Sequence, residues 1–214
     1  MLNIVTSHTI DRYQIELNEA FRLRHRVFVE EKGWTGLRRD DGCEIDRFDD
    51  EHAVHMLYVE AGRVIGYQRM LPTTQPHLLS DVMPELCEGR RPVGPNIWEW
   101  TRYCVEPAYR ERGRMLSPVA NALLSGIVEW GLDTGVDTII IETNPLWLLR
   151  LVQLHFRVTP LGLPRLINGE ETVAVTASFD RRTLDRLRET RTVSPAAVAP
   201  PALSSRRTHN RQAP

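Results

Sequence analysis

The stretch Asn96-Ile-Trp-Glu-Trp-Thr-Arg-Tyr-Cys-Val-Glu-Pro107 decides the fold, because it sets two charges, Glu99 and Arg102, among residues that favour strands. Aromatic and β-branched side chains fit a pleated surface, and the Asn and Pro at its ends are typical of strand boundaries. We therefore expect a central strand. Because side chains alternate between the faces of a strand, one face should carry Glu99, Thr101 and Tyr103, and the other Trp98, Trp100 and Arg102.

The two charges of this strand need a cleft, a partner or a substrate, since an unpaired charge in a buried strand costs several kcal/mol. For these two charges, one alternative is a structural ion pair with Arg69 or Asp46, and for Glu99 the other alternative is a general base. Structural networks perturb carboxylates as readily as active sites do, so the strand alone leaves both roles open.

Length and composition predict one globular domain. The 214 residues are 42% hydrophobic and 26% charged, which is enough for a full core. We assign residues 1–192 to this domain. Residues 193–214 are dominated by Pro, Ala, Ser and Arg, offer too few large apolar side chains to offset ordering entropy, and are expected to be disordered.

Charge and cysteine usage argue against several classes of protein. A net charge of -1 gives no basic field for nucleic acid or an anionic membrane surface, and no apolar stretch is long enough to span a bilayer. Cys43, Cys87 and Cys104 are scattered without a Cys-x-x-Cys pair, so neither a disulfide framework nor a metal site is expected. The N-terminus lacks the pattern of a secretion signal, which predicts a cytoplasmic protein.

Two segments in the first quarter of the chain carry candidate binding residues. Residues 10–29 have apolar side chains every three or four positions and predict an amphipathic helix, capped by Thr9 or Asp11. Arg24 and Phe28 stand four residues apart on this helix, so they share a face and could set a cation beside an aromatic ring, unless Phe28 is core. The loop over residues 31–50 either serves a site or faces solvent with its acids Glu44, Asp46, Asp49 and Asp50.

The remaining elements complete an α/β pattern, a mixed sheet with helices on both faces. We expect a hairpin from residues 52–60 and 63–71, an excursion with a short helix over 72–95, strands over 136–143 and 173–179, and helices over 116–132, 145–156 and 181–190. The loop before the helix at 116 is either a phosphate cradle or a solvated turn, and it contains Arg110, Arg112, Gly113 and Arg114.

These residues resemble, in order and spacing, the signature of the acyl-homoserine-lactone synthases. The motifs are Arg24-x-x-x-Phe28, Trp34, Glu44-Ile-Asp46-x-x-Asp49, Gly66-x-x-Arg69 and Glu99-x-x-Arg102. The resemblance implies an acetyltransferase-like, three-layer α-β-α sandwich with a mixed central sheet. It also implies the family's reaction: the amine of S-adenosylmethionine is acylated from an acyl thioester, and the product closes to a lactone and releases methylthioadenosine. Both reactants are substrates, and no cofactor is implied.

The resemblance also distributes roles over the chain. S-adenosylmethionine binding is implied for Arg24, Phe28, Trp34, Glu44 and Asp46. The catalytic group comprises Glu99, Arg102, Asp46, Asp49 and Arg69, with Glu99 as the candidate base for an amine whose kind titrates at about 8. The acyl thioester is expected to contact Arg102, Tyr103, Arg110, Arg112, Gly113, Thr143 and Trp147. Backbone N–H groups beside a bulge in the central strand are the expected oxyanion donors.

Within this family, Phe21-Arg-Leu-Arg-His25 and Val158-Thr-Pro-Leu-Gly-Leu-Pro164 are similar to members that take short, branched or aryl acyl groups from coenzyme A. Acyl carrier protein is the other possible donor. Trp147 then either fills the far end of the acyl pocket or serves as helix core. Two other functions share parts of the pattern, an acetyl-coenzyme A-dependent N-acetyltransferase and a non-catalytic sensor of an acyl thioester or S-adenosylmethionine. A simple acetyltransferase has no need for an acidic loop opposite three arginines.

Overall fold

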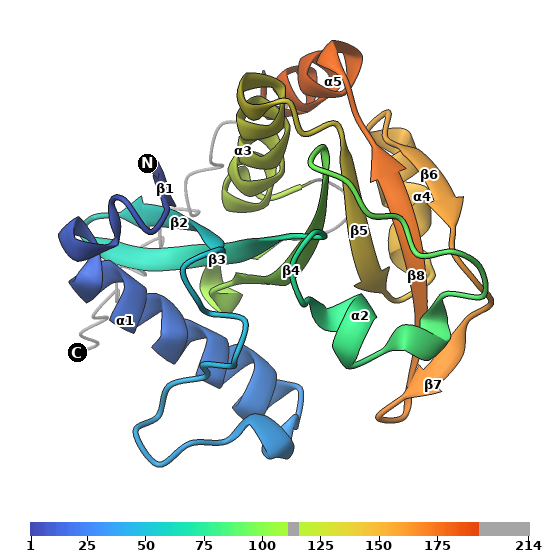
Figure 1. Ribbon diagram of the computed structural model, residues 1–214. Coiled ribbons are helices and arrows are strands. Elements are labelled where there is room, and N and C mark those ends of the chain that lie inside the picture. Colours follow the sequence, from blue (N-terminus) through green and yellow to red (C-terminus); the bar gives the residue numbers. More distant parts are fainter. Residues whose placement is uncertain (111–115, 193–214) are drawn as a thin grey trace, which may run out of the picture.

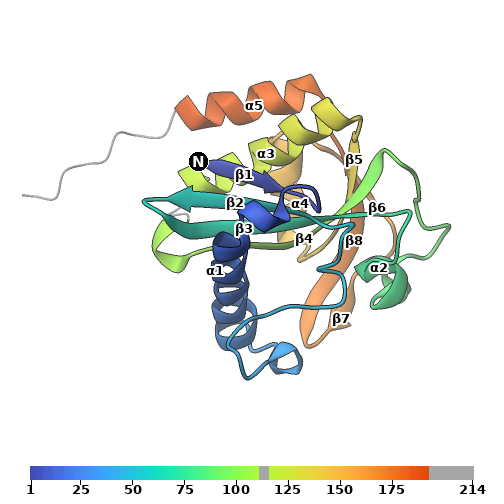
Figure 2. The same ribbon diagram turned by 60° about the vertical axis from the view of Figure 1, so that its left-hand side comes forward.

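The structure, a computed structural model, describes residues 1–110 and 116–192. The tail over 193–214 that we expect to be disordered, and Arg112, Gly113 and Arg114 of the expected phosphate loop, lie outside the described residues. One sheet lies between two layers of helices (Figure 1 and Figure 2). This arrangement confirms the three-layer α-β-α sandwich expected from the sequence.

Within the described residues, the sheet contains eight strands, and seven of them follow the order β1-β2-β3-β4-β5-β8-β6. These seven are β1 Leu2–Val5, β2 Val54–Glu60, β3 Arg63–Pro72, β4 Ile97–Val105, β5 Thr138–Thr143, β6 Arg157–Pro160 and β8 Glu170–Ser178. β4 and β5 pair in parallel and the other neighbours pair antiparallel, so the sheet is mixed. The last strand, β7 Arg165–Ile167, forms a hairpin with the start of β8.

The helices divide between the two faces of the sheet. One face carries α1 Gln14–Arg24, which continues as a π-helix over His25–Glu31, and the short α2 Leu78–Asp81. The other face carries α3 Pro118–Thr134, α4 Leu146–Gln153 and α5 Arg181–Thr192. Short 3-10 turns lie at Ile10–Arg12, Thr35–Leu37, Pro84–Leu86 and Pro107–Tyr109. None of the helices in the described part of the chain is long and apolar enough to cross a membrane.

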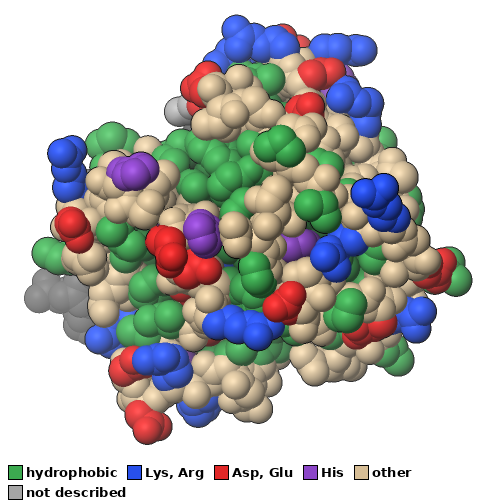
Figure 3. All heavy atoms as spheres, viewed as in Figure 1, with side chains coloured by type: hydrophobic (Ala, Val, Ile, Leu, Met, Phe, Trp, Pro, Cys, Tyr) green, Lys and Arg blue, Asp and Glu red, His purple; other side chains and the backbone are tan. Residues whose placement is uncertain are grey.

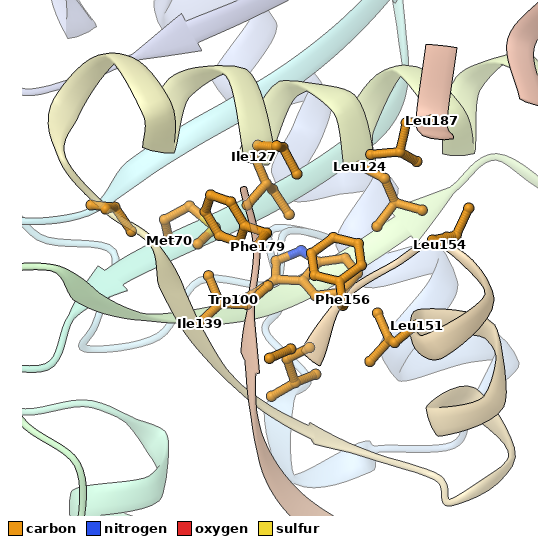
Figure 4. Close-up of a cluster of buried hydrophobic side chains, with 14 of the residues drawn as sticks. Met70, Trp100, Leu124, Ile127, Ile139, Leu151, Leu154, Phe156, Phe179 and Leu187 are labelled. Atoms are coloured by element: carbon orange, nitrogen blue, oxygen red, sulfur yellow. The ribbon is translucent and has the colours of Figure 1, made fainter. Parts of the chain in front are cut away.

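The main core fills the space between the sheet and α3 (Figure 4). Trp100 of β4 packs there with Ile127 of α3 and Phe179, and its indole N–H donates to Gln68 Oε1 at 3.1 Å. Gly66 in β3 allows α3 to approach, because a Cβ at this position would meet Val119 Cγ1 at 2.6 Å. The glycine of the Gly66-x-x-Arg69 motif therefore serves packing. Over the face seen in Figure 3, acidic and basic side chains are interspersed.

Most expected elements are confirmed, and the turn between β2 and β3 is Ala61-Gly62, with φ of 48° and 77°. Positive φ at both positions suits a two-residue hairpin turn. The expected helix cap is wrong: α1 begins after Tyr13 without a side-chain capping bond, because the 3-10 turn at 10–12 separates Thr9 and Asp11 from it. β1, β6 and β7 were not expected from the sequence. Each has four residues or fewer, so its pairing partner, rather than its own pattern, fixes it.

Candidate active site

A bulge and a separation of strands shape the middle of the sheet. β4 pairs with β5 only from Ile97 to Glu99 and separates from it beyond that point. On the other side, Arg69 of β3 lies opposite Thr101 and Tyr67 lies opposite Cys104. Gln68 alone therefore faces two residues, Arg102 and Tyr103, which is a β-bulge, and Arg102 takes the left-handed φ of 54°.

The bulge corrects the expected alternation of the central strand. Arg102, expected on the face of Trp100, lies with Thr101 and reaches the acidic loop. Tyr103, expected on the face of Glu99, instead contacts Trp100 and Trp147, with ring centroids 5.2 and 5.6 Å apart. The extra residue shifts the two-residue period by one position, so both side chains exchange faces.

Three arginines and three acids from distant parts of the chain form one buried ion-pair network. Its members are Arg24, Glu44, Asp46, Asp49, Arg69 and Arg102. Arg24 donates to Glu44 at 2.6 Å and to both oxygens of Asp49 at 2.7 and 3.0 Å. Arg69 donates to Asp46 at 2.6 and 3.0 Å and to Asp49 at 2.7 Å. The acidic loop is therefore not a solvated run, because Glu44, Asp46 and Asp49 are all paired with arginines.

Arg102 is the member of the network that borders the cleft. It donates to Glu44 at 3.1 and 3.2 Å and to Asp46 at 2.7 Å, using Nε and Nη2. Among the described residues, no group accepts a hydrogen bond from its Nη1, whereas Arg24 and Arg69 use Nε and both terminal nitrogens. The side chains of Arg24 and Arg69 are 0% exposed, and that of Arg102 is 8% exposed. Arg102 is thus the arginine with a donor available to a ligand.

The network holds its acids in the charged form. Burial alone would raise the pKa of Asp49, but Arg24 and Arg69 outweigh burial and hold it well below its ordinary value. The pKa of Asp46 is also lowered, because Arg69 and Arg102 outweigh its burial. Both carboxylates are therefore ionised at neutral pH, and three negative charges balance three positive ones.

A cleft of about 1200 Å³ opens where β4 and β5 separate. Phe28 and Trp34 form one wall and are stacked, with ring centroids 5.1 Å apart and planes at 18°. The expected cation beside Phe28 is not Arg24, which lies over Phe21 and Tyr67. Arg102 lies 5.7 Å from the Phe28 ring instead, because α1 gives way to the π-helix between Arg24 and Phe28.

The opposite wall comes from β5 and α4. Thr143, Trp147 and Leu151 line it, and the edge of Trp147 meets Tyr103 of β4. The expected acyl-thioester residues Arg102, Tyr103, Thr143 and Trp147 thus border one cleft. Arg110 borders it as well, but its guanidinium pairs with Glu31 and donates to the Val105 carbonyl at 2.8 Å.

Glu99 is fully buried and has partners that the sequence did not suggest. Its carboxylate accepts hydrogen bonds from His77 Nδ1 at 2.8 Å, Leu78 N at 2.9 Å and Leu79 N at 2.7 Å. Glu99 therefore forms no ion pair with Arg69, because the excursion between β3 and β4 folds α2 over this position, whereas Arg102 of the same strand does pair with Asp46. Glu99 does not border the cleft, so as a base it would need an intermediary.

Two side chains near Glu99 escaped the sequence reasoning. His77 lies in the excursion without any motif. Glu142 lies near the end of an apolar strand. An acid in a buried strand is the signal that singled out Glu99, so the same signal could have found Glu142.

Cys104, expected to be a core thiol, is 3% exposed, and burial raises its pKa to about 12. No group of three or more His, Cys, Asp or Glu within the described ranges is arranged to hold a metal ion.

Fold and site together define an acyltransferase. A likeness to a solved acyl-CoA N-acyltransferase from Pseudomonas aeruginosa, with a TM-score of 0.57 and 14% identity over 82% of this chain and 97% of that chain, shows the fold alone. The model of the autoinducer synthase family matches residues 8–187, and the chain belongs to this family.

Among its relatives, the isovaleryl-homoserine lactone synthase of Bradyrhizobium diazoefficiens is 40% identical over 190 residues, 88% of this chain and 84% of the relative. A CoA-dependent acyl-homoserine lactone synthase, BjaI, solved with S-adenosylmethionine and isopentyl-CoA, has a TM-score of 0.84 and 38% identity, covering 91% of this chain and 90% of that chain. The expected reaction is thereby confirmed: the chain is an acyltransferase that makes an N-acyl-homoserine lactone from S-adenosylmethionine and an acyl thioester.

Proposed function

We propose that the acyl donor is a free coenzyme A thioester of a short branched or aryl acid. The isovaleryl-homoserine lactone synthase relative and the solved CoA-dependent synthase support this choice. The aromatic contact between Tyr103 and Trp147 supports it as well, because two large rings at the wall shorten the space for a straight chain. Long acyl groups on a carrier protein are the competing donors.

The free Nη1 of Arg102 carries the assignment of the S-adenosylmethionine site. A guanidinium matches a carboxylate, so this group holds the carboxylate of the substrate close to its own γ-carbon for lactone closure. The stacked Phe28 and Trp34 receive the sulfonium and adenosine end, where a cation over a ring gains about 0.5 to 2 kcal/mol. The other five members of the ion-pair network, Asp46 included, do not border the cleft, so they act by fixing Arg102.

Acylation follows from the same geometry. The amine of S-adenosylmethionine attacks the thioester carbon where β4 and β5 separate. A bulge leaves a backbone group outside the ladder, so we assign stabilisation of the oxyanion to the N–H groups of Arg102 and Tyr103. The substrates are metabolites of the cell interior, and cytoplasmic localisation remains our prediction.

The test supplies purified protein with S-adenosylmethionine and either isovaleryl-CoA or the same acyl group on acyl carrier protein. Mass spectrometry then follows isovaleryl-homoserine lactone and methylthioadenosine. We expect both products with the coenzyme A donor at the higher kcat/KM. A preference for long acyl chains on the carrier protein would contradict the proposal. Acylation without methylthioadenosine release would indicate an ordinary N-acyltransferase, and binding without turnover would indicate a sensor.

A further inference from the structure

Two carboxyl groups, those of Glu99 and Glu142, lie on neighbouring strands beside the cleft, and in the described part of the chain neither pairs with Lys or Arg. Glu99 pairs with Ile140 in the parallel ladder, and Glu142 lies two residues further along β5, on the same face. Diagonal neighbours on adjacent strands lie within reach of long side chains, so the carboxyl group of Glu142 can approach that of Glu99. Its Oε1 is buried and finds no donor among the described residues. Two ionised carboxylates in this position would repel each other, so they share a proton.

The surroundings decide which carboxyl group carries that proton. Glu99 accepts three hydrogen bonds, from His77 Nδ1 and from the backbone N–H groups of Leu78 and Leu79, and these stabilise a negative charge. Oε1 of Glu142, by contrast, finds no donor within residues 1–110 and 116–192. Burial and the charge of Glu99 raise the pKa of Glu142 well above its ordinary value. At neutral pH, Glu142 is therefore the neutral acid and donates its proton to Glu99.

Only one member of the pair reaches the substrates. Glu142 borders the cleft and is half-buried, whereas Glu99 is fully buried behind it. We assign the buried Oε1 to the contact with Glu99 and Oε2 to the cleft. The other charged groups of the cleft lie elsewhere. Arg102 keeps only Nη1 for a ligand, His77 lies on Glu99, and Lys32 is exposed over Phe28 and Trp34. The cleft acids are exposed as well, and one of them, Glu31, pairs with Arg110; they are Glu31, Glu85 and Glu170.

We infer that Glu142 is a catalytic residue, which takes the proton of the attacking amine on Oε2 while the proton on Oε1 passes to Glu99. This inference rests on the proposed function, which places that amine in the cleft. The nitrogen lone pair forms the bond to the thioester carbon, and the carbonyl π pair moves to oxygen. Collapse of this adduct expels the thiolate. The pair then returns one proton to the thiolate, so amine and thioester yield amide and thiol and the shared proton is restored.

The test is Glu142→Gln, because the amide has the same shape and its N–H can donate to Glu99 in place of the acid O–H. An amide cannot relay a proton. We expect kcat for thiol release to fall by about 10² to 10⁴-fold. Calorimetry should find S-adenosylmethionine affinity within about threefold of wild type, so that the loss falls on kcat and not on substrate binding. The matched control is Glu171→Gln, an exposed acid outside the cleft, which should keep wild-type turnover.

Turnover of Glu142→Gln within about threefold of wild type would overturn the inference. If the variant fails to fold, difference infrared spectroscopy on the wild-type enzyme decides instead. We expect the carbonyl band of a protonated carboxylic acid at neutral pH, and its absence would also overturn the inference. A wild-type enzyme that forms no lactone from isovaleryl-CoA contradicts the proposed donor, whereas Glu142 is judged with whichever thioester supports turnover.

Discussion

Replacing Asp49 by Asn removes one negative charge from the centre of the ion-pair network. The Asp49 side chain is 2% exposed and joins the two arginines that are wholly buried, Arg24 and Arg69, at 2.7 Å each. Asn keeps the shape and one acceptor. The substitution leaves three guanidinium groups facing two carboxylates, so one positive charge stays buried without compensation.

The expected cost follows from that burial. Removing one partner of a buried ion pair costs about 3 to 5 kcal/mol of the free energy of unfolding, which exceeds the value of an exposed pair several-fold. The pH dependence has a definite sign. Because the folded pKa of Asp49 lies below its unfolded value, its contribution is present above the unfolded pKa of about 3.9 and is lost as pH falls through the folded pKa. The lowered pKa of Asp46 acts in the same direction.

Urea denaturation at pH 7 and at a series of lower pH values measures both effects. We expect Asp49→Asn to be less stable at pH 7 and to lose less stability on acidification than wild type, although Asp46 preserves part of the slope. The control is Asp40→Asn, the same change at an exposed position of the same loop, which should stay within about 0.5 kcal/mol of wild type. Equal stability of the two variants at pH 7, or an unchanged pH slope in Asp49→Asn, would refute the reasoning.

Three other substitutions test the site itself. Glu99→Gln should lower the rate of acylation by about 10² to 10⁴-fold in a folded protein, because Glu142 loses the carboxylate that accepts its proton. Near-normal methylthioadenosine release by this variant would show that Glu99 takes no part in proton transfer. Asp46→Ala should weaken S-adenosylmethionine binding more than acyl-CoA binding in calorimetry, because Arg102 loses its brace, and unchanged affinity for both would reject the assignment. Trp147→Ala should raise kcat/KM for longer acyl-CoA chains by about 10-fold or more, whereas Leu149→Ala, a change at an exposed position of the same helix, should not. An unchanged chain-length profile in Trp147→Ala would contradict the assignment of Trp147 to the acyl pocket.

The helices and strands that form the layers of the fold were predicted from local patterns in the sequence. Alternating and helical periods placed β4, the hairpin of β2 and β3, and the helices α3 to α5 to within a few residues. The same patterns missed β1, β6 and β7, because strands this short are defined by hydrogen bonds to a neighbour that is distant in sequence. The motif spacing marked the six residues of the ion-pair network as a group before their contacts were known.

The sequence by itself determined the sandwich, the family and the identity of the charged residues, because periodicity and motif spacing are properties of the chain. Only the tertiary structure decided which of these residues can touch a substrate. The bulge opposite Gln68 turns Arg102 toward the acids and Tyr103 toward Trp147. It depends on the register in which β4 pairs with β3, and the sequence of β4 alone does not contain that register. Glu142 borders the cleft that opens where β4 and β5 separate, whereas Glu99 lies in the paired part of β4 and does not border it. Exposure and partners depend on elements distant in the chain, and a one-dimensional pattern does not contain them.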